Sequence, residues 1–149
     1  MKTIILLGST GSIGRQTLEI CRENPREFKI IGLAGGQNSA LLRRQISEFR
    51  PKFVATNCPE KFSKIKILPL EKIAAQKCDL VVSAIAGVAG LAPTLVALRA
   101  GNSVALANKE SLVLAGKIVR AAAKKSGAQI FPIDSEHSAI WQLLAKIPR

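Results

Sequence analysis

Two acidic residues stand two positions apart near the carboxyl-terminal end of the sequence. Asp134 and Glu136 flank Ser135 and follow the apolar run that ends at Ile133. In an extended chain, residues two apart project from the same side, so both carboxylates would face one ligand. Hard divalent cations prefer such oxygen ligands, and the spacing therefore predicts part of a metal site. The alternative is structural, because two acids also suit the cap and first turn of a helix.

A glycine-rich loop, GSTGSIG, follows the first apolar run of the sequence. Its glycines are Gly8, Gly11 and Gly14. Between a strand and a helix, the first glycine permits a tight turn, the second lets backbone N–H groups approach a pyrophosphate, and the third allows close packing of the helix. The helix N-terminus adds free N–H donors and a favourable dipole. The loop predicts dinucleotide binding, and the alternative is a tight turn without a ligand.

The end of the second apolar run indicates which dinucleotide binds. NAD-binding units usually carry Asp or Glu there, which binds the ribose hydroxyls. Here the residues are Gly35-Gly36-Gln37-Asn38-Ser39, without an acid, and Arg43 and Arg44 follow. A neutral loop rich in donors beside arginines suits a 2′-phosphate, so we predict NADPH rather than NADH.

A third polar group, Asn108-Lys109-Glu110, follows the fifth apolar run, where folds of this kind bind ligands. Asn108 fits a helix N-cap, which is its structural interpretation. Lys109 could instead hold a substrate phosphate or hydroxyl, and Glu110 could orient a ribose or the lysine.

Apolar and amphipathic runs alternate along the chain and predict alternating strands and helices. We expect strands at 3–8, 29–34, 52–56, 79–84, 103–107 and 129–133. We expect helices at 13–23, 38–49, 70–76, 89–100, 111–125 and from 138 towards 146. The strands are nearly continuous apolar runs, which indicates a parallel sheet covered on both faces. The sequence thus predicts an α/β protein with a Rossmann-like, doubly wound parallel sheet in one domain over residues 1–149, with 57–69 as a surface connection.

The net charge of +12 allows either a nucleic-acid surface or a solvated basic shell that favours phosphorylated ligands. Lys117, Arg120, Lys124 and Lys125 are spaced to share one exposed helix face, and the other basic residues are scattered. The sequence has no Tyr and only 4% aromatic residues, so it offers no stacking platform for bases. We therefore expect a basic shell and no nucleic-acid partner.

The uncharged stretch from 80 to 98 raises the question of a membrane span. It contains Ser83, Gly87, Gly90 and Pro93, which fit a strand, a glycine turn and a buried helix better than a span, so we expect no membrane partner. The sequence opens without the pattern of a secretory leader. Its three cysteines form no CxxC, and we expect a cytoplasmic protein with reduced thiols.

Three motifs together resemble the 1-deoxy-D-xylulose 5-phosphate reductoisomerase family. They are GSTGSIG at 8–14, LANKES at 106–111 and PIDSEHSAI at 132–140, in the family's order and spacing along the whole chain. Many NADP-dependent families share such a glycine loop, so the other two motifs carry the specificity. The resemblance implies conversion of 1-deoxy-D-xylulose 5-phosphate to 2-C-methyl-D-erythritol 4-phosphate in non-mevalonate isoprenoid biosynthesis. It also implies NADPH and Mg²⁺ or Mn²⁺ as cofactors, and a homodimer for the full-length enzyme.

The resemblance also implies roles for single residues. Lys109 would contact the phosphorylated sugar substrate and add positive charge beside its reacting oxygens. Ser135 and Glu136 would contact the substrate, Asp134 and Glu136 would bind the metal, and His137 would belong to the scaffold of the motif. The implied cofactor-binding residues are Thr10, Gly11, Ser12, Ile13, Gly36, Gln37, Asn38, Asn108 and Glu110.

The sequence departs from the family in two ways. Gln37 stands where family members often have a basic residue, so backbone donors and nearby arginines would have to recognise the 2′-phosphate. Family enzymes are also far longer, with a further metal-binding glutamate, substrate-phosphate residues, a lid and dimer contacts. We therefore expect the NADPH-binding portion of such an enzyme, inactive or nearly so in isolation. The alternatives are a stand-alone NADP-binding regulatory or interaction module, and an oxidoreductase such as a semialdehyde dehydrogenase, which the lack of an evident nucleophilic cysteine disfavours.

Overall fold

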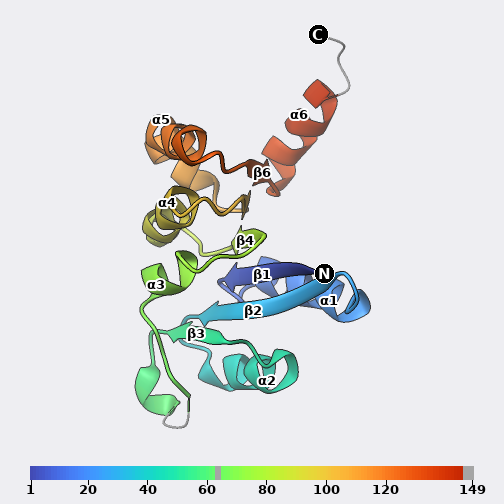
Figure 1. The fold of residues 1–149 in the computed structure, drawn as a ribbon, viewed down its shortest axis with the longest axis vertical. Helices are drawn as coiled ribbons and strands as arrows, with labels where there is room; N and C mark the ends of the chain where they lie inside the picture. The colour runs from blue at the N-terminus through green and yellow to red at the C-terminus, as the bar shows by residue number, and fades with distance from the viewer. Residues whose placement is uncertain (63–64, 146–149) are drawn as a thin grey trace.

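Six parallel strands form one sheet in the computed structural model, which describes residues 1–62 and 65–145. The strand order is β3-β2-β1-β4-β5-β6, so the chain winds outward from β1 in both directions (Figure 1). This order is that of a Rossmann-like, doubly wound sheet, as the sequence predicts. The strands are β1 (Lys2–Leu7), β2 (Phe28–Gly35), β3 (Phe53–Thr56), β4 (Leu80–Ser83), β5 (Val104–Leu106) and β6 (Ile130–Pro132).

Helices cover both faces of this sheet. In Figure 1, α3, α4 and α5 lie together on one side, whereas α1 lies on the other. The helices are α1 (Ser12–Glu23), α2 (Ser39–Phe49), α3 (Leu70–Ala74), α4 (Leu91–Arg99), α5 (Lys109–Ser126) and α6 (Ser135–Ala145), with 3-10 turns η1 (Pro59–Lys61) and η2 (Val88–Gly90). The expected last helix therefore exists, and its expected end at Lys146 lies outside the described residues.

The hydrophobic core has two layers, one on each face of the sheet. Alternate residues of β1 enter opposite layers, with Ile5 and Leu7 packed under α3, α4 and α5, and Ile4 and Leu6 packed with residues of α1 and α2. All four of these side chains are buried. Burial on both faces explains why the strands read as continuous apolar runs and why the sequence located them within one or two residues.

Two helices begin two or three residues earlier than the sequence indicated. The α5 helix starts at Lys109, because the Asn108 side chain caps it by accepting a hydrogen bond from the Ser111 N–H at 2.8 Å. The α6 helix starts at Ser135 rather than at Ser138. The expectation that Asp134 and Glu136 project together from an extended chain is therefore wrong, since Glu136 lies in the first helical turn.

The connection between β3 and α3 is more structured than a surface loop. It contains the turn η1, and Phe62 is only 3% exposed within the layer that holds α1 and α2. Ile67 forms an isolated parallel bridge with Val54 of β3. These contacts hold the segment against the edge of the sheet.

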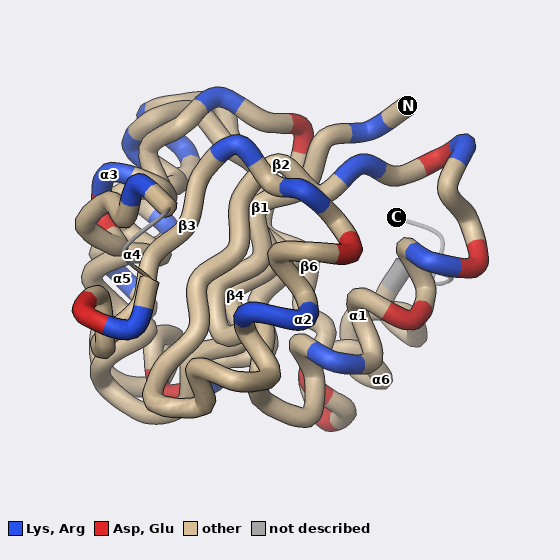
Figure 2. Tube along the Cα trace, turned by 90° about the horizontal axis from the view of Figure 1, so that it is seen from below, with Lys and Arg blue, Asp and Glu red and all other residues tan. Residues whose placement is uncertain are grey.

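The structure also shows where the basic residues, the uncharged stretch and the cysteines of the sequence lie. Lys and Arg positions are distributed around the trace in Figure 2. The stretch from 80 to 98 forms β4, η2 and α4, and no helix within the described ranges is long and apolar enough to cross a membrane. The three cysteines, Cys21, Cys58 and Cys78, are free thiols.

The close approach of α1 to the first turn gives a test of the fold. A Cβ atom at Gly14 would lie 2.2 Å from the Gly8 carbonyl oxygen, whereas one at Gly36 would meet nothing within 4 Å. We expect Gly14→Ala to lower the free energy of unfolding by at least ~2 kcal/mol in urea denaturation, since the backbone must shift to relieve the overlap. Gly36→Ala serves as the control and should stay within about 0.5 kcal/mol of the parent chain. Equal stabilities for the two variants would contradict the packing.

Candidate functional site

The glycine loop lies at the centre of the sheet's carboxyl edge. Gly8 has a φ of 89°, in the left-handed region that favours glycine, and a Cβ atom there would lie 2.5 Å from the Ala84 carbonyl oxygen. The N–H groups of Gly8 and Ser9 both donate to the Ala34 carbonyl oxygen, at 2.9 and 2.8 Å. The loop is thus held between the ends of β2 and β4, at the point where the winding direction reverses.

A buried pair of polar side chains fixes the loop to α2. The Ser9 hydroxyl donates to Gln45 Oε1 at 2.7 Å, and Gln45 Nε2 donates to the Ser9 carbonyl oxygen at 2.8 Å. Ser9 is 0% exposed and Gln45 is 5% exposed. Neither residue stood out in the sequence, because a buried glutamine carries no local signal until its distant partner is known.

Two cavities flank the loop. One has a volume of about 520 Å³, and its walls include Gly11, Asn108 and Glu136. The other has a volume of about 380 Å³, and its walls include Gly36 and Thr56. The two cavities share four lining residues, Gly11, Ala84, Ile85 and Ala86, so they form adjoining parts of one crevice along the carboxyl edge.

Most residues expected at a site converge on this crevice. The larger cavity is lined by Gly11, Ser12, Ile13, Asn108, Lys109, Glu110, Asp134, Ser135 and Glu136. Gly36 lines the smaller cavity. Three expected residues, Thr10, Gln37 and Asn38, line neither cavity.

Several of the crevice walls went unnoticed in the sequence. They are the apolar turn Ala84-Ile85-Ala86, the residues Thr56 and Asn57 at the end of β3, and the segment 68–70 at the start of α3. The signal that could have found the first two is positional, because each directly follows a strand, and ligands bind at the carboxyl ends of strands in such sheets. The segment 68–70 had no comparable signal.

The oxygen and the nitrogen of the Asn108 carboxamide both form hydrogen bonds within the protein. Its Oδ1 accepts from the N–H and the hydroxyl of Ser111, both at 2.8 Å. Its Nδ2 donates to the carbonyl oxygens of Ile85 and Gly87. Asn108 is 2% exposed, so the side chain joins the end of β4 to the start of α5.

Lys109 and Glu136 form an ion pair across the larger cavity. Lys109 Nζ lies 3.1 Å from Glu136 Oε1, and the Ser135 hydroxyl donates to Glu136 Oε2 at 2.7 Å. Hydrogen bonds from Ser135 and from the backbone, with Lys109 adding to them, lower the pKa of Glu136 to about 2. The same contact raises the pKa of Lys109. The site therefore holds a carboxylate and an ammonium group together at neutral pH.

Asp134 lies beside this pair and caps α6. Its Oδ2 accepts from the His137 N–H at 3.2 Å and contacts His137 Nδ1 at 2.6 Å. This contact ties His137 to the residue that caps α6, and its expected scaffold role stays a prediction. Asp134 and Glu136 still line the same cavity, so the capping role and a metal-binding role are compatible.

The carboxylates fit one part of a divalent-metal site. Carboxylate oxygens are suitable ligands, and the Lys109 contact shows that Glu136 already accepts a cation. Within residues 1–62 and 65–145, however, no group of three or more His, Cys, Asp or Glu side chains is arranged to hold a metal. The described residues supply two carboxylates, fewer than the six oxygen ligands that such ions take.

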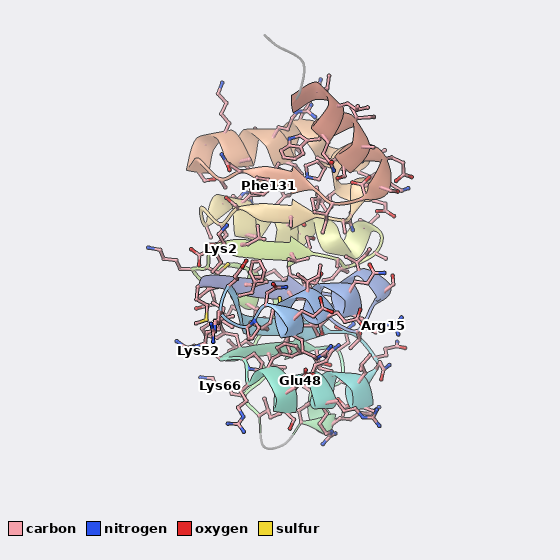
Figure 3. The ribbon with its side chains drawn as sticks, turned by 90° about the vertical axis from the view of Figure 1, so that its right-hand side faces the viewer. Lys2, Arg15, Glu48, Lys52, Lys66 and Phe131 are labelled. Atoms are coloured by element: carbon pink, nitrogen blue, oxygen red, sulfur yellow. The ribbon has the colours of Figure 1, made fainter. Side chains whose placement is uncertain are left out.

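The loop after β2 contributes Gly36 to the smaller cavity, while Asn38 and Arg43 beyond it contact other parts of the protein. Asn38 caps α2, because its Oδ1 accepts from the Leu41 N–H at 3.1 Å. Arg43 donates to the Lys61 carbonyl oxygen at 2.6 Å and lies over the Phe62 ring at 5.2 Å. Figure 3 shows Arg15 on the side toward which the strand arrows point, whereas Lys2 and Lys52 lie at the opposite edge.

The fold and the crevice define a doubly wound α/β domain of the dinucleotide-binding class. Its glycine turn meets an α-helix N-terminus at the topological switch point, which is where such domains bind their ligands. A homoserine dehydrogenase from Thiobacillus denitrificans shares this fold, with a TM-score of 0.64 at 22% identity over 88% of this chain and 29% of that one.

Sequence comparison identifies the family within this class of domains. The family profile for 1-deoxy-D-xylulose 5-phosphate reductoisomerase matches residues 4–116, and the chain belongs to this family. The reductoisomerase of Caldanaerobacter subterraneus subsp. tengcongensis is 49% identical over 97% of this chain and 41% of its own length. The Thermus thermophilus enzyme is 45% identical over 97% of this chain and 40% of its own length. The chain thus spans about two fifths of these curated relatives.

Solved structures agree with the family. A crystal structure of DOX-P reductoisomerase in complex with NADPH, fosmidomycin and magnesium gives a TM-score of 0.90 at 42% identity, over 95% of this chain and 38% of that one. A complex of DOX-P reductoisomerase with magnesium gives the same TM-score at 41% identity, over 95% of this chain and 39% of that one.

The pKa of Glu136 tests the electrostatics of the site. We expect its carboxyl ¹³C resonance to remain that of the ionised form down to about pH 3.5, because its pKa lies near 2 rather than at the ordinary 4.5. The Ser135 hydroxyl bond is the largest cause, so Ser135→Ala should raise the pKa toward the ordinary value. Because the folded-state pKa is depressed, the stability from this contact is lost as the pH falls from about 4.5 towards 2. A parent midpoint near 4.5 would contradict the geometry.

Proposed function

We propose that this chain is the NADPH-binding portion of a 1-deoxy-D-xylulose 5-phosphate reductoisomerase. The observation that carries the proposal is the convergence of three separate segments on one crevice. The glycine loop, Asn108-Lys109-Glu110 and Asp134-Ser135-Glu136 come from three different strand ends and line the same cavity. A merely tight turn at the glycine loop would not require the other two segments to meet it.

The two adjoining cavities suit the two halves of a dinucleotide. In this proposal the pyrophosphate lies on Gly11, Ser12 and Ile13, where the α1 N-terminus supplies N–H donors and a favourable dipole. The adenosine half lies toward Gly36 in the smaller cavity, and the nicotinamide half lies toward Glu110 in the larger one. Thr10 would act beside the loop rather than as a wall of either cavity.

Recognition of the 2′-phosphate would rest on neutral donors and arginines. Gln37 and Asn38 follow β2 without an acidic residue, which removes the group that favours NADH. The Asn38 side chain caps α2, so its contribution would come from the backbone. Arg44 is exposed on the same helix, and in this proposal it supplies positive charge.

The larger cavity suits a phosphorylated sugar and a divalent cation. NADPH would supply the hydride, and Mg²⁺ or Mn²⁺ would polarise the substrate oxygens. Asp134 and Glu136 would hold the ion, and Ser135 would orient the Glu136 carboxylate through their 2.7 Å hydrogen bond. The Lys109 ammonium would stabilise negative charge on the substrate oxygens, because it already lies 3.1 Å from a carboxylate in this cavity.

A complete enzyme of this kind would need more than these residues. Two carboxylates leave most positions on a divalent ion to other ligands, and the cavity is open to solvent, which weakens electrostatic stabilisation. The proposal therefore assigns cofactor binding and part of the metal site to this chain. Turnover, the remaining metal ligands and homodimer formation belong to the full-length protein.

Nucleotide titration tests the cofactor assignment. We expect the chain to bind NADPH at least tenfold more tightly than NADH in isothermal titration calorimetry, because the β2 loop lacks an acid that would bind the ribose hydroxyls and repel a phosphate. Raised salt should weaken NADPH binding more than NADH binding, since only NADPH carries the extra phosphate charge. Equal affinities for the two nucleotides would contradict the assignment.

Turnover measurements test whether this chain alone lacks the activity of a full-length enzyme. With 1-deoxy-D-xylulose 5-phosphate, NADPH and Mn²⁺, we expect NADPH oxidation by the 149-residue chain to stay at the rate of the protein-free reaction. The full-length Thermus thermophilus relative serves as the positive control under the same conditions. Steady turnover by the chain alone would contradict the claim that its site is partial.

A further inference from the structure

The turn after β4 borders both cavities and has backbone N–H groups without a partner in the protein's described residues. Ile85 and Ala86 line both of them, and Gly87 follows at the start of η2. Among the described residues, no backbone or side-chain oxygen accepts a hydrogen bond from the N–H groups of Ile85, Ala86 or Gly87. Backbone donors are strong hydrogen-bonding groups, and an unpaired set beside a crevice is available to a ligand acceptor.

Two carbonyl groups of the same turn are held by the Asn108 side chain. Its Nδ2 donates to the oxygens of both Ile85 and Gly87, while its Oδ1 accepts from Ser111. These partners determine which end of the carboxamide is nitrogen and which is oxygen. The end that faces two carbonyl oxygens must donate, and the end that faces the Ser111 N–H must accept. The amide therefore fixes the direction of the peptide groups in the turn.

The packing around Asn108 is exact enough to restrict the turn. A Cβ atom at Gly90 would lie 2.4 Å from Asn108 Nδ2 and 2.7 Å from the Ile85 carbonyl oxygen. On the other side, a Cβ atom at Gly8 would lie 3.0 Å from the Ile85 nitrogen. The turn is thus held between the glycine loop and the start of α5.

We infer that Asn108 is a positioning residue that aims the N–H groups of the Ile85–Gly87 turn at the bound ligand, and that these N–H groups, not the Asn108 amide, are the donors that meet it. The ligand group would be an oxygen acceptor, either a phosphate oxygen or the amide oxygen of a nicotinamide. This inference rests on the proposed function, because it takes the dinucleotide as the occupant of the crevice. It assigns Asn108 an indirect role, since all of its hydrogen-bonding groups are already engaged at 2% exposure.

Asn108→Asp separates the two roles of the side chain. The introduced carboxylate keeps the acceptor for Ser111 but loses both donors to Ile85 and Gly87. Gly90→Ala disturbs the same contacts from the other side, because its Cβ atom would lie 2.4 Å from Asn108 Nδ2 and 2.7 Å from the Ile85 carbonyl oxygen. We expect either change to weaken NADPH binding about tenfold, the loss that corresponds to one or two well-placed hydrogen bonds.

Asn102 offers a matched control at the opposite edge of the sheet. It is also 2% exposed, its Nδ2 donates to the carbonyl oxygens of Ala74 and Gln76, and its Oδ1 accepts from the Cys78 N–H. Asn102→Asp therefore removes the same kind of donors from an equally buried site that lines neither cavity. We expect it to lower the unfolding temperature as Asn108→Asp does, without changing NADPH affinity.

The deciding readout is the ¹H–¹⁵N spectrum of the chain during NADPH titration. In the parent chain we expect the backbone N–H signals of Ile85, Ala86 and Gly87 to shift, while the Asn108 side-chain NH₂ signals stay in place. In Asn108→Asp, the shifts at these three residues should shrink, and Gly11 should still respond. Each of the three variants, Asn108→Asp, Gly90→Ala and Asn102→Asp, should first show a native far-ultraviolet circular dichroism spectrum.

Three results would overturn the inference. One is a shift of the Asn108 NH₂ signals with unchanged Ile85–Gly87 signals, which would mean direct contact. Another is an equal loss of NADPH affinity in Asn102→Asp, which would mean a general structural effect. In both cases the glycine loop would still respond and the proposed function would stand. If NADPH shifts no signal in the parent chain, including those of Gly11 and Ser12, the proposed function itself fails, and this inference fails with it.

Discussion

The structure depends on how closely the start of α1 approaches the end of β1. With glycine at both positions, Gly14 packs directly on the backbone of Gly8, and Gly8 packs on the end of β4 at Ala84. This contact aims the N-terminus of α1 at the carboxyl edge of the sheet. The Ser9–Gln45 pair then fixes α2 to the same loop, so one turn sets the positions of two helices and two neighbouring strands. The crevice is the space that these constraints leave open.

The remaining polar groups of the site are positioned by helix starts. Asn108 precedes and caps α5, and Asp134 precedes and caps α6, because both side chains accept hydrogen bonds from the first turn of their helix. The capping bonds bring Lys109 and Glu136 close enough to pair at 3.1 Å. The two interpretations that the sequence left open, cap or functional group, are therefore not exclusive here. The cap fixes the start of the helix, and in the proposed site the residues of that start, Asp134 included, supply the chemical groups.

Much of the fold could be predicted from the sequence because burial on both faces leaves a simple pattern. The strands are short apolar runs, and the glycine spacing marks the turn from β1 to α1. The start of α6 could not be predicted from pattern alone, since Asp134 and Ser138 are both residue types that cap helices. The hydrogen bond from the His137 N–H to Asp134 decides between them, and it depends on the path by which the chain leaves β6.

Some parts of the site could likewise be predicted from local sequence, whereas others depend on residues far apart in the chain. The polar motifs at Gly8–Gly14, Asn108–Glu110 and Asp134–Glu136 are visible in the sequence, because each follows a strand. The walls of the crevice at Ile85 and Thr56 are apolar or small, so their residue types carry no signal and only their position at strand ends could mark them. The engagement of the whole Asn108 carboxamide also depends on residues more than twenty positions away, at Ile85 and Gly87.

The central claim is that one dinucleotide spans both cavities across the glycine loop. A crystal structure of the 149-residue chain with NADPH tests it most directly. The account predicts the pyrophosphate on the N–H groups of Gly11–Ile13, the adenosine phosphate beside Gly36, and the nicotinamide in the cavity that holds Lys109 and Glu136. A nucleotide bound away from the carboxyl edge, or one confined to a single cavity with its pyrophosphate off the loop, would contradict the account.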